Sequence, residues 1–169
     1  TEYTIPDSVT TLKGNIFDGC TTLQSVTIPD SVTTIDRNTF ANCPNINTFS
    51  GKYASIDGRS LIMDGTLIIF APKDLSHYTI QDGVTAIGEG AFYGCSELQS
   101  ITFPDSVTAI GNSAFEKCNA IRNLEIPSSI TTIGNRAFYE CGILDNITIA
   151  NGVTYVGEKA FAGFFGKLN

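Results

Sequence analysis

The six residues "IPDSVT" at positions 5–10 return unchanged at 28–33, and this repetition is the strongest indication of the fold in the sequence. Near-copies begin at Ile80, Phe103, Ile126 and Ile149: "IQDGVT", "FPDSVT", "IPSSIT" and "IANGVT". Neighbouring copies start 23 residues apart, except that 52 residues separate the starts at 28 and 80. A fixed period of this length predicts a solenoid, in which each coil buries its apolar side against its neighbours. We therefore predict one domain over residues 1–169, with a long variant coil at 51–79.

Each copy carries apolar residues at constant offsets. A phenylalanine recurs in all six copies, at Phe17, Phe40, Phe92, Phe115, Phe138 and Phe161. The aliphatic residue of "SVT" recurs as Val9, Val32, Val84, Val107, Ile130 and Val153, and another follows as Leu12, Ile35, Ile87, Ile110, Ile133 and Val156. Burying one Phe or Ile contributes roughly 1.5–3 kcal/mol before entropy costs, so ladders of these residues can form the core.

The repeat also predicts its local structure. The segment "L-x-x-I-T-I" alternates β-formers and predicts a short strand, "P-D-S" predicts a turn, and "V-T-x-I-G" predicts a second extended piece. The spacing in "A-F-x-x-C-x-x-L" predicts one or two turns of helix. The expected fold is an α/β repeat solenoid, a right-handed coil with parallel short strands and short helical turns. In "IPDSVT" we expect Ile and Val in the core, and Ser and Thr facing water.

The variant coil at 51–79 contains a hairpin signal. In "LIM-DG-TLIIF", Asp-Gly suits a two-residue turn between strands, and "ASI-DG-RSL" repeats the pattern. We predict a β-hairpin excursion that rejoins the ladder at Tyr78 and Ile80. One interpretation is a projecting contact surface with Tyr53, Met63 and Phe70 as anchors. The favoured interpretation is an insertion that packs its apolar side onto neighbouring coils.

The five cysteines occupy one position of the repeat: Cys20, Cys43, Cys95, Cys118 and Cys141. Zinc needs four ligands that converge, whereas a ladder is a line and the only histidine, His77, falls elsewhere in the repeat. Parallel Cβ vectors on neighbouring coils do not suit a disulfide. We predict buried free thiols, no metal and no cofactor. The third position of "IPDSVT" holds Asp7 and Asp30 in the first repeats, and a row of carboxylates is able to bind calcium. The same position holds Ser128 and Asn151 in the last repeats, so we interpret these residues as turn-capping residues.

No motif indicates catalysis. The glycines of "IGEGAFYG" (87–94) are spaced one residue too far for a dinucleotide loop, and "GNSAF" (111–115) lacks the final glycine of a nucleophile elbow. With a single histidine, the sequence predicts a protein that is not an enzyme. The net charge of −7 and the pI near 4.5 argue against nucleic acid and anionic membrane surfaces as partners. The apolar runs are too short to span a bilayer.

The outward residues of the first strand of each repeat form the candidate binding surface. We expect them to line the concave side, where solenoids commonly bind. One row is Glu2, Ser25, Thr48, His77, Ser100, Asn123 and Asn146, and the next is Thr4, Thr27, Ser50, Thr79, Thr102, Glu125 and Thr148. The charged residues of this surface lie in the later repeats, at Arg122, Glu125 and Asp145. This patch is the first choice for a contact site. The alternative is a solvated sheet face, with threonine present for its β-propensity.

The stretch "LQSITFPDSVTAIGNSAFEKCNAIRNLEIPSSITTIGNRAFYEC" (98–141) resembles the BspA-like leucine-rich repeat family, and the resemblance covers 5–163 apart from the long coil. Two details depart from the regular pattern. Lys13 and Asp36 stand where later copies have glycine, so the first two coils should turn differently. Residues 164–169 form an irregular end, a cap or a truncation.

The resemblance implies an extracellular or cell-surface protein of a bacterium or protozoan, with no catalytic residues. Its expected function is a non-enzymatic scaffold of adhesin type that binds a host or microbial protein, or a glycan. The alternatives are a structural spacer within a larger surface protein and, less favoured, an accessory carbohydrate-binding domain of a secreted enzyme. The strand-like start "TEYTI" lacks a polar cap, which favours a piece of a longer array or a chain completed by partners.

Overall fold

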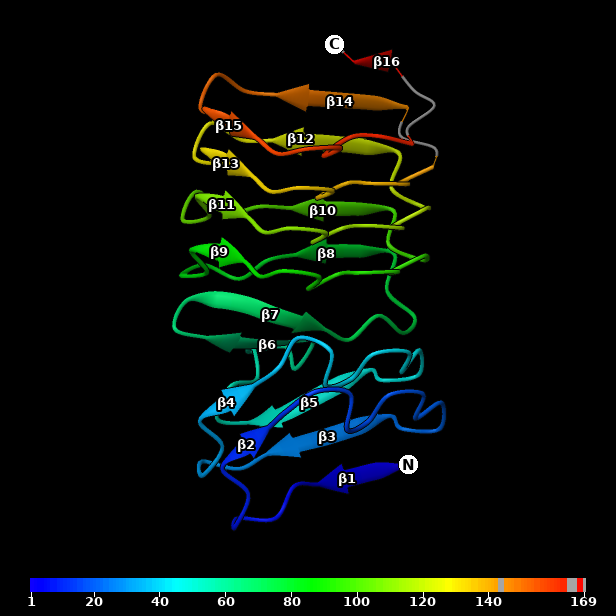
Figure 1. Ribbon diagram of the computed structural model, residues 1–169, viewed down its shortest axis with the longest axis vertical. Coiled ribbons are helices and arrows are strands. Elements are labelled where there is room, and N and C mark those ends of the chain that lie inside the picture. The colour runs from blue at the N-terminus through cyan, green and yellow to red at the C-terminus, as the bar shows by residue number, and fades with distance from the viewer. Residues whose placement is uncertain (143–144, 164–166, 169) are drawn as a thin grey trace.

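A computed structural model of the protein describes residues 1–142, 145–163 and 167–168. Short strands stack along the long axis, with the two termini at opposite ends (Figure 1). One face, here called the strand face, holds β1 (Glu2–Thr4), β3 (Ser25–Ile28), β5 (Thr48–Gly51), β8 (His77–Thr79), β10 (Ser100–Thr102), β12 (Asn123–Ile126), β14 (Asn146–Ile149) and β16 (Lys167–Leu168). A second face holds β2 (Thr11–Leu12), β4 (Thr34–Ile35), β6 (Ser60–Met63), β7 (Thr66–Phe70), β9 (Ala86–Ile87), β11 (Ala109–Ile110), β13 (Thr132–Ile133) and β15 (Tyr155–Val156).

Apart from the β6–β7 pair, the strands pair in parallel, and equivalent residues of successive repeats lie side by side. Ser25 pairs with Thr48, Ile110 with Ile133, and Leu124 with Ile147. The strand face is divided into the sheets β1-β3-β5, β8-β10 and β12-β14-β16, and the second face into β2-β4 and β15-β13-β11-β9-β7-β6. The predicted parallel solenoid is therefore confirmed.

The predicted short helices are wrong, because the part of the chain that the structure describes contains no helix. The segment that carries the Phe and Cys of each repeat, here called the corner, is a succession of turns. Lys117 and Glu140, two residues after the phenylalanine, have φ of 64° and 55°, which a helix does not accept. Their N–H groups donate to the next coil instead of to a residue four positions back. The fold class is accordingly a β-solenoid rather than α/β.

The core consists of ladders of equivalent side chains, as predicted. Phe92, Phe115 and Phe138 are fully buried, and neighbouring rings stack with centroids 4.7 and 5.1 Å apart. Phe17 stacks on Phe40 at 5.1 Å in the same way. The buried apolar residues form two clusters, which meet at the variant coil.

The variant coil contains the predicted hairpin, formed by β6 and β7 in antiparallel pairing. Asp64 and Gly65 both have positive φ, 49° and 74°, which suits a two-residue turn whose twist matches the strands. Phe70 donates its N–H to the carbonyl of Ala91, and its ring lies 4.6 Å from that of Phe92. It therefore takes the place of the repeat's phenylalanine in this coil.

The hydroxyl groups of "IPDSVT" do not simply face water. Ser31 and Ser106 donate to the carbonyl oxygens of Val9 and Val84 in the preceding coil, at 2.8 and 2.7 Å. Five of the threonines donate in the same way, at 3.2 Å: Thr33, Thr85, Thr108, Thr131 and Thr154. The repeated segment thus joins neighbouring coils as well as turning the chain.

Two residues of the C-terminal segment form a strand. Lys167 and Leu168 form β16, which pairs in parallel with Asn146 and Ile147 of β14. The expectation for 164–166 and Asn169 lies outside the described residues.

Candidate functional site

The two predicted rows on the strand face are present. Val26, Tyr78 and Leu124 point into the core, so the residues on either side of each of them face outward. Within each sheet the row members lie in register: Thr27 beside Ser50, Thr79 beside Thr102, and Glu125 beside Thr148. The rows are interrupted between β5 and β8 and between β10 and β12, where the strands are not paired.

Within each row, outward side chains of neighbouring strands form hydrogen bonds with one another. Thr27 and Ser50 hydroxyls are 2.8 Å apart, His77 Nδ1 and Ser100 Oγ are 2.7 Å apart, and Asn146 Nδ2 donates to Asn123 Oδ1 at 3.1 Å. Such bonds hold the outward polar groups at fixed positions between strands. The face is therefore an ordered polar surface, with its hydrogen-bonding groups in rows at the repeat spacing.

The predicted charged patch lies at one end of this face. Arg122 and Asp145 approach to 3.7 Å, and both side chains are 56% exposed. Glu125 stands in the neighbouring row, exposed, beside Thr148. The structure thus brings Arg122 and Asp145 together, whereas Glu125 has no ion-pair partner among the described residues.

The hairpin candidates are placed differently from the prediction. Phe70 is only 5% exposed and its ring packs in the core, so it does not project from the hairpin as the contact-surface interpretation requires. Tyr53 is half-buried and donates its hydroxyl to Val32 O at 2.8 Å, and Met63 is half-buried in β6. The exposed apolar residue of this coil is Ile56, at 95%, which the sequence did not single out.

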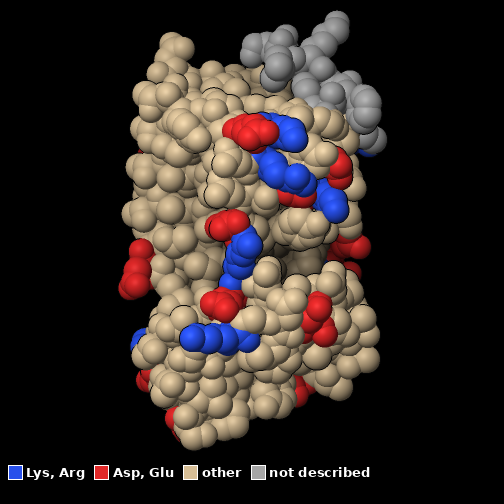
Figure 2. All heavy atoms as spheres, in the orientation of Figure 1, with Lys and Arg blue, Asp and Glu red and all other residues tan. Residues whose placement is uncertain are grey.

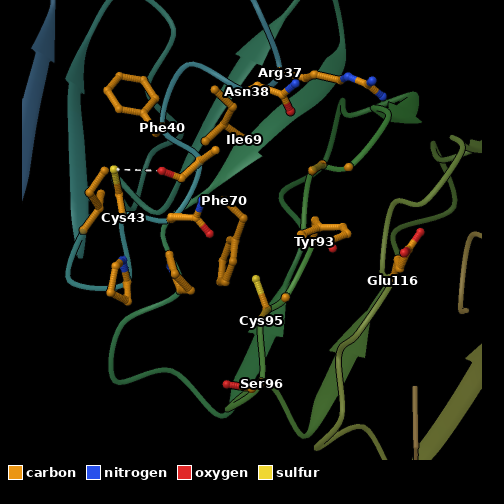
Figure 3. Close-up of a pocket in the computed structure, with 18 of the residues that line it drawn as sticks. Arg37, Asn38, Phe40, Cys43, Ile69, Phe70, Tyr93, Cys95, Ser96 and Glu116 are labelled. Atoms are coloured by element: carbon orange, nitrogen blue, oxygen red, sulfur yellow. Dashed lines mark hydrogen bonds between the residues drawn. The ribbon is translucent and has the colours of Figure 1, made fainter. Parts of the chain in front are cut away.

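A cleft of about 850 Å³ lies at the corner, between the coil of Phe40 and the coil of Tyr93 (Figure 3). Phe40, Phe49, Ile69 and Phe70 form apolar parts of its lining. An ion pair between Arg37 and Glu89 joins the two coils at its rim. Figure 2 shows a hollow in this face of the molecule, with basic and acidic side chains around it.

The cleft arises because the corner of the variant coil is short. Leu67 pairs with Ile87, and Phe70 packs on Phe92. Two residues therefore lie between these positions in the variant coil, whereas four lie between them in the next coil. The shortened segment leaves the outer part of the corner unfilled. Sequence reasoning missed this cleft, because the shorter spacing is recognisable only once Leu67 is aligned with Ile87.

An ion pair between the buried Glu116 and the partly exposed Arg136 lies at the edge of the cleft. Glu116 is 4% exposed and accepts from Arg136 Nε and Nη2 at 3.0 and 2.7 Å. These hydrogen bonds lower the pKa of Glu116 below its ordinary value. The Arg136 guanidinium also lies 4.1 Å from the ring centroid of Tyr139. The pair is a structural one, because both partners are engaged within the protein.

The cysteines form the predicted row of free thiols, buried except for the half-buried Cys20. Three donate to the carbonyl of the phenylalanine one coil back: Cys43 to Phe17, Cys118 to Phe92 and Cys141 to Phe115, at 2.9, 3.1 and 3.0 Å. Burial raises the pKa of Cys43 and of Cys118, which keeps these groups in the thiol form. In the described ranges, no three His, Cys, Asp or Glu side chains are grouped to hold a metal.

A family sequence model and several solved structures are similar to this chain. The sequence model described as "BspA type Leucine rich repeat region (6 copies)" matches residues 1–58 and 68–169, and omits most of the β6–β7 hairpin. No curated protein matches the chain significantly. The described residues contain no helix that is long and apolar enough to span a membrane.

Solved structures with this fold come from several bacteria. A leucine rich cell surface protein from Faecalibacterium prausnitzii is 24% identical, with a TM-score of 0.67 over 99% of this chain and 59% of its own. A leucine-rich repeat protein from Bacteroides ovatus is 28% identical, with a TM-score of 0.53 over 94% and 51%. The T. pallidum leucine rich repeat protein is 23% identical, with a TM-score of 0.56 over 99% and 68%. The chain thus spans about three fifths of the first of these proteins. With the family's repeat matched along nearly all of its length, the chain belongs to the BspA-type leucine-rich repeat family.

Proposed function

We propose that this chain is a non-enzymatic protein-binding scaffold of an extracellular or cell-surface protein, and that its strand face makes the contact. The observation that carries the proposal is the pair of outward polar rows, ordered along the stack by Thr27–Ser50, His77–Ser100 and Asn123–Asn146 hydrogen bonds. A rigid surface of this kind offers many donors and acceptors without losing side-chain entropy on binding. The Faecalibacterium structure of this fold is described as a cell surface protein, which supports the location.

Within this face, the patch of Arg122, Glu125 and Asp145 is the proposed centre. Arg122 and Asp145 are 3.7 Å apart and more than half exposed. Either side chain can therefore leave this ion pair and form a new one with a charged group of the partner. Glu125 adds an exposed carboxylate from the adjacent strand position. Exposed charges of this sort set partner choice and association rate more than affinity.

The test is binding of the purified chain to immobilised extracellular-matrix proteins and glycans. The double variant Arg122→Ala/Glu125→Ala is compared with Asp7→Ala/Lys13→Ala, which removes the same charges from exposed positions outside the strand face. We expect binding to a protein that the first variant weakens at least tenfold and the second leaves unchanged.

The alternatives give different results in the same assay. Binding to glycans alone would support a carbohydrate-binding domain, and absence of binding to the whole panel would support a spacer. Equal binding by both variants would place the contact outside the patch.

A further inference from the structure

The corners of regular repeats are joined by a backbone ladder. Phe92 and Gly94 donate their N–H groups to the carbonyls of Ala114 and Glu116 in the next coil, both at 2.8 Å. The same two positions donate in the following coils: Phe115 to Ala137, Lys117 to Tyr139, Phe138 to Ala160 and Glu140 to Ala162, at 2.7–2.9 Å. Each corner therefore offers two donors toward the C-terminal neighbour and accepts two from the N-terminal one.

This ladder is broken at the cleft. The equivalent donors of the second repeat are the N–H groups of Phe40 and Asn42, and neither has a hydrogen-bond partner among the described residues. On the opposite wall, Phe70 N–H still reaches the carbonyl of Ala91 at 3.1 Å. The next donor position is Pro72, which has no N–H, so the carbonyl of Tyr93 receives no bond from the described part of the variant coil.

The thiol row is interrupted at the same place. Cys43, Cys118 and Cys141 each donate to a phenylalanine carbonyl one coil back, whereas no such bond is found for Cys95 in the described structure. Figure 3 shows Cys95 at the cleft, with Phe40 and Cys43 on one side and Tyr93 on the other. The cleft is therefore bounded by backbone groups whose equivalents are hydrogen-bonded between the first and second repeats and between the successive coils from Phe92 to Ala162.

We infer that the cleft binds an extended peptide segment of a partner protein, which completes the interrupted ladder. The peptide carbonyls accept from Phe40 and Asn42, one of its N–H groups donates to the Tyr93 carbonyl, and an apolar side chain lies against Phe40 and Phe70. Backbone pairing with an unpaired edge is a common mode of peptide recognition. The volume of about 850 Å³ lies within the range of about 300–1,000 Å³ that ligand sites occupy. A peptide fits better than a compact small molecule, because the unpaired groups recur at backbone spacing.

This site belongs to the class of the proposed function, protein binding, but it uses none of the strand-face residues. The two are therefore tested separately. The Arg122→Ala/Glu125→Ala variant should bind a cleft peptide as the natural chain does, so loss of one activity leaves the other intact.

The probe is a synthetic peptide with capped ends and the sequence of a regular corner, residues 112–119, with its cysteine replaced by serine (NSAFEKSN). Amide hydrogen exchange of the whole chain is followed by NMR with and without this peptide. Without it, the amides of Phe40 and Asn42 should exchange faster than those of Phe115 and Lys117 at the same repeat positions. Saturating peptide should slow exchange at Phe40 and Asn42 at least fivefold and leave Phe115 and Lys117 unchanged.

A steric variant gives the second arm. Ser96 is exposed and lines the cleft, and Asn119 is the exposed residue at the same repeat position one coil later. Ser96→Trp should weaken peptide binding at least tenfold, whereas Asn119→Trp should not. Unchanged exchange at Phe40 and Asn42 with millimolar peptide, or equal binding by the two tryptophan variants, would overturn the inference.

Discussion

Phe115 and Phe138 stack face to face, with ring centroids 5.1 Å apart and planes within 1° of parallel. Both side chains are fully buried, and Phe161 continues the stack at 5.3 Å. Each ring therefore contacts an equivalent ring on both sides, and a change at one position affects two coil interfaces. This relationship makes the middle of the stack the most sensitive part of the core.

Replacing Phe115 with alanine should lower the free energy of unfolding by roughly 3–5 kcal/mol, because it leaves a cavity between two stacked rings. Phe17→Ala is the matched control in the first repeat, where the side chain is only half-buried and should cost clearly less. Urea denaturation followed by circular dichroism measures both. Equal losses would mean that burial along the stack does not determine stability.

The strand register was predictable because, in a regular repeat, each strand residue pairs with the residue at the same repeat position of the next coil. Ser25 beside Thr48 and Asn123 beside Asn146 follow from the period alone. The corner was not predictable, because the spacing of Phe115 and Cys118 suits a helix as well as a series of turns. Lys117, with φ of 64°, gives no local sign of its conformation, which depends on the hydrogen bond of its N–H to Tyr139 in the next coil.

The cleft was missed for a related reason. From the sequence alone, Phe70 is interpreted as an exposed hairpin residue. In the structure, the pairing of Leu67 with Ile87 aligns Phe70 with the phenylalanine ladder. Only that alignment shows that Pro72 stands at a position where other coils have an N–H donor. The strand-face rows were located correctly, and their role in binding remains a prediction.

Replacing Gly134 with alanine should destabilise the fold by roughly 1–3 kcal/mol, because the chain must move to admit a side chain. A Cβ at this position would lie 2.6 Å from Asn112 N and 2.7 Å from Gly111 C, which are backbone atoms of the preceding coil. Lys13→Ala is the control, since the same position of the first repeat already holds an exposed side chain. A thermal melt in which both variants lose the same stability would contradict the close-approach explanation.

Native protein should react rapidly with a thiol reagent such as DTNB at Cys20 alone, because this cysteine is half-buried and the others are buried. Cys118 is fully buried, and burial raises its pKa, so little thiolate forms there at neutral pH. The remaining thiols should react only in denaturant. Mass spectrometry after brief labelling identifies the modified residue, and Cys20→Ser should abolish the fast phase. Fast labelling of Cys118 in the folded chain would contradict its burial.

Replacing Glu116 with glutamine should reduce stability at neutral pH by about 1 kcal/mol, since Arg136 is partly exposed and screened by solvent. The sign of the pH dependence follows from the hydrogen bonds of Arg136, which lower the pKa of Glu116 in the folded chain. A carboxyl with a lowered folded pKa stabilises the fold above its unfolded value of about 4.3. That stabilisation is lost as the pH falls through the folded pKa. The natural chain should therefore lose more stability than Glu116→Gln between neutral and acidic pH.

Glu97→Gln provides the control for this comparison, because Glu97 is exposed and should leave the pH profile unchanged. Urea midpoints measured across the acidic range give the three profiles. If Glu116→Gln and the natural chain lose stability in parallel on acidification, the buried ion pair does not contribute to the fold in the way that the two hydrogen bonds to Arg136 indicate.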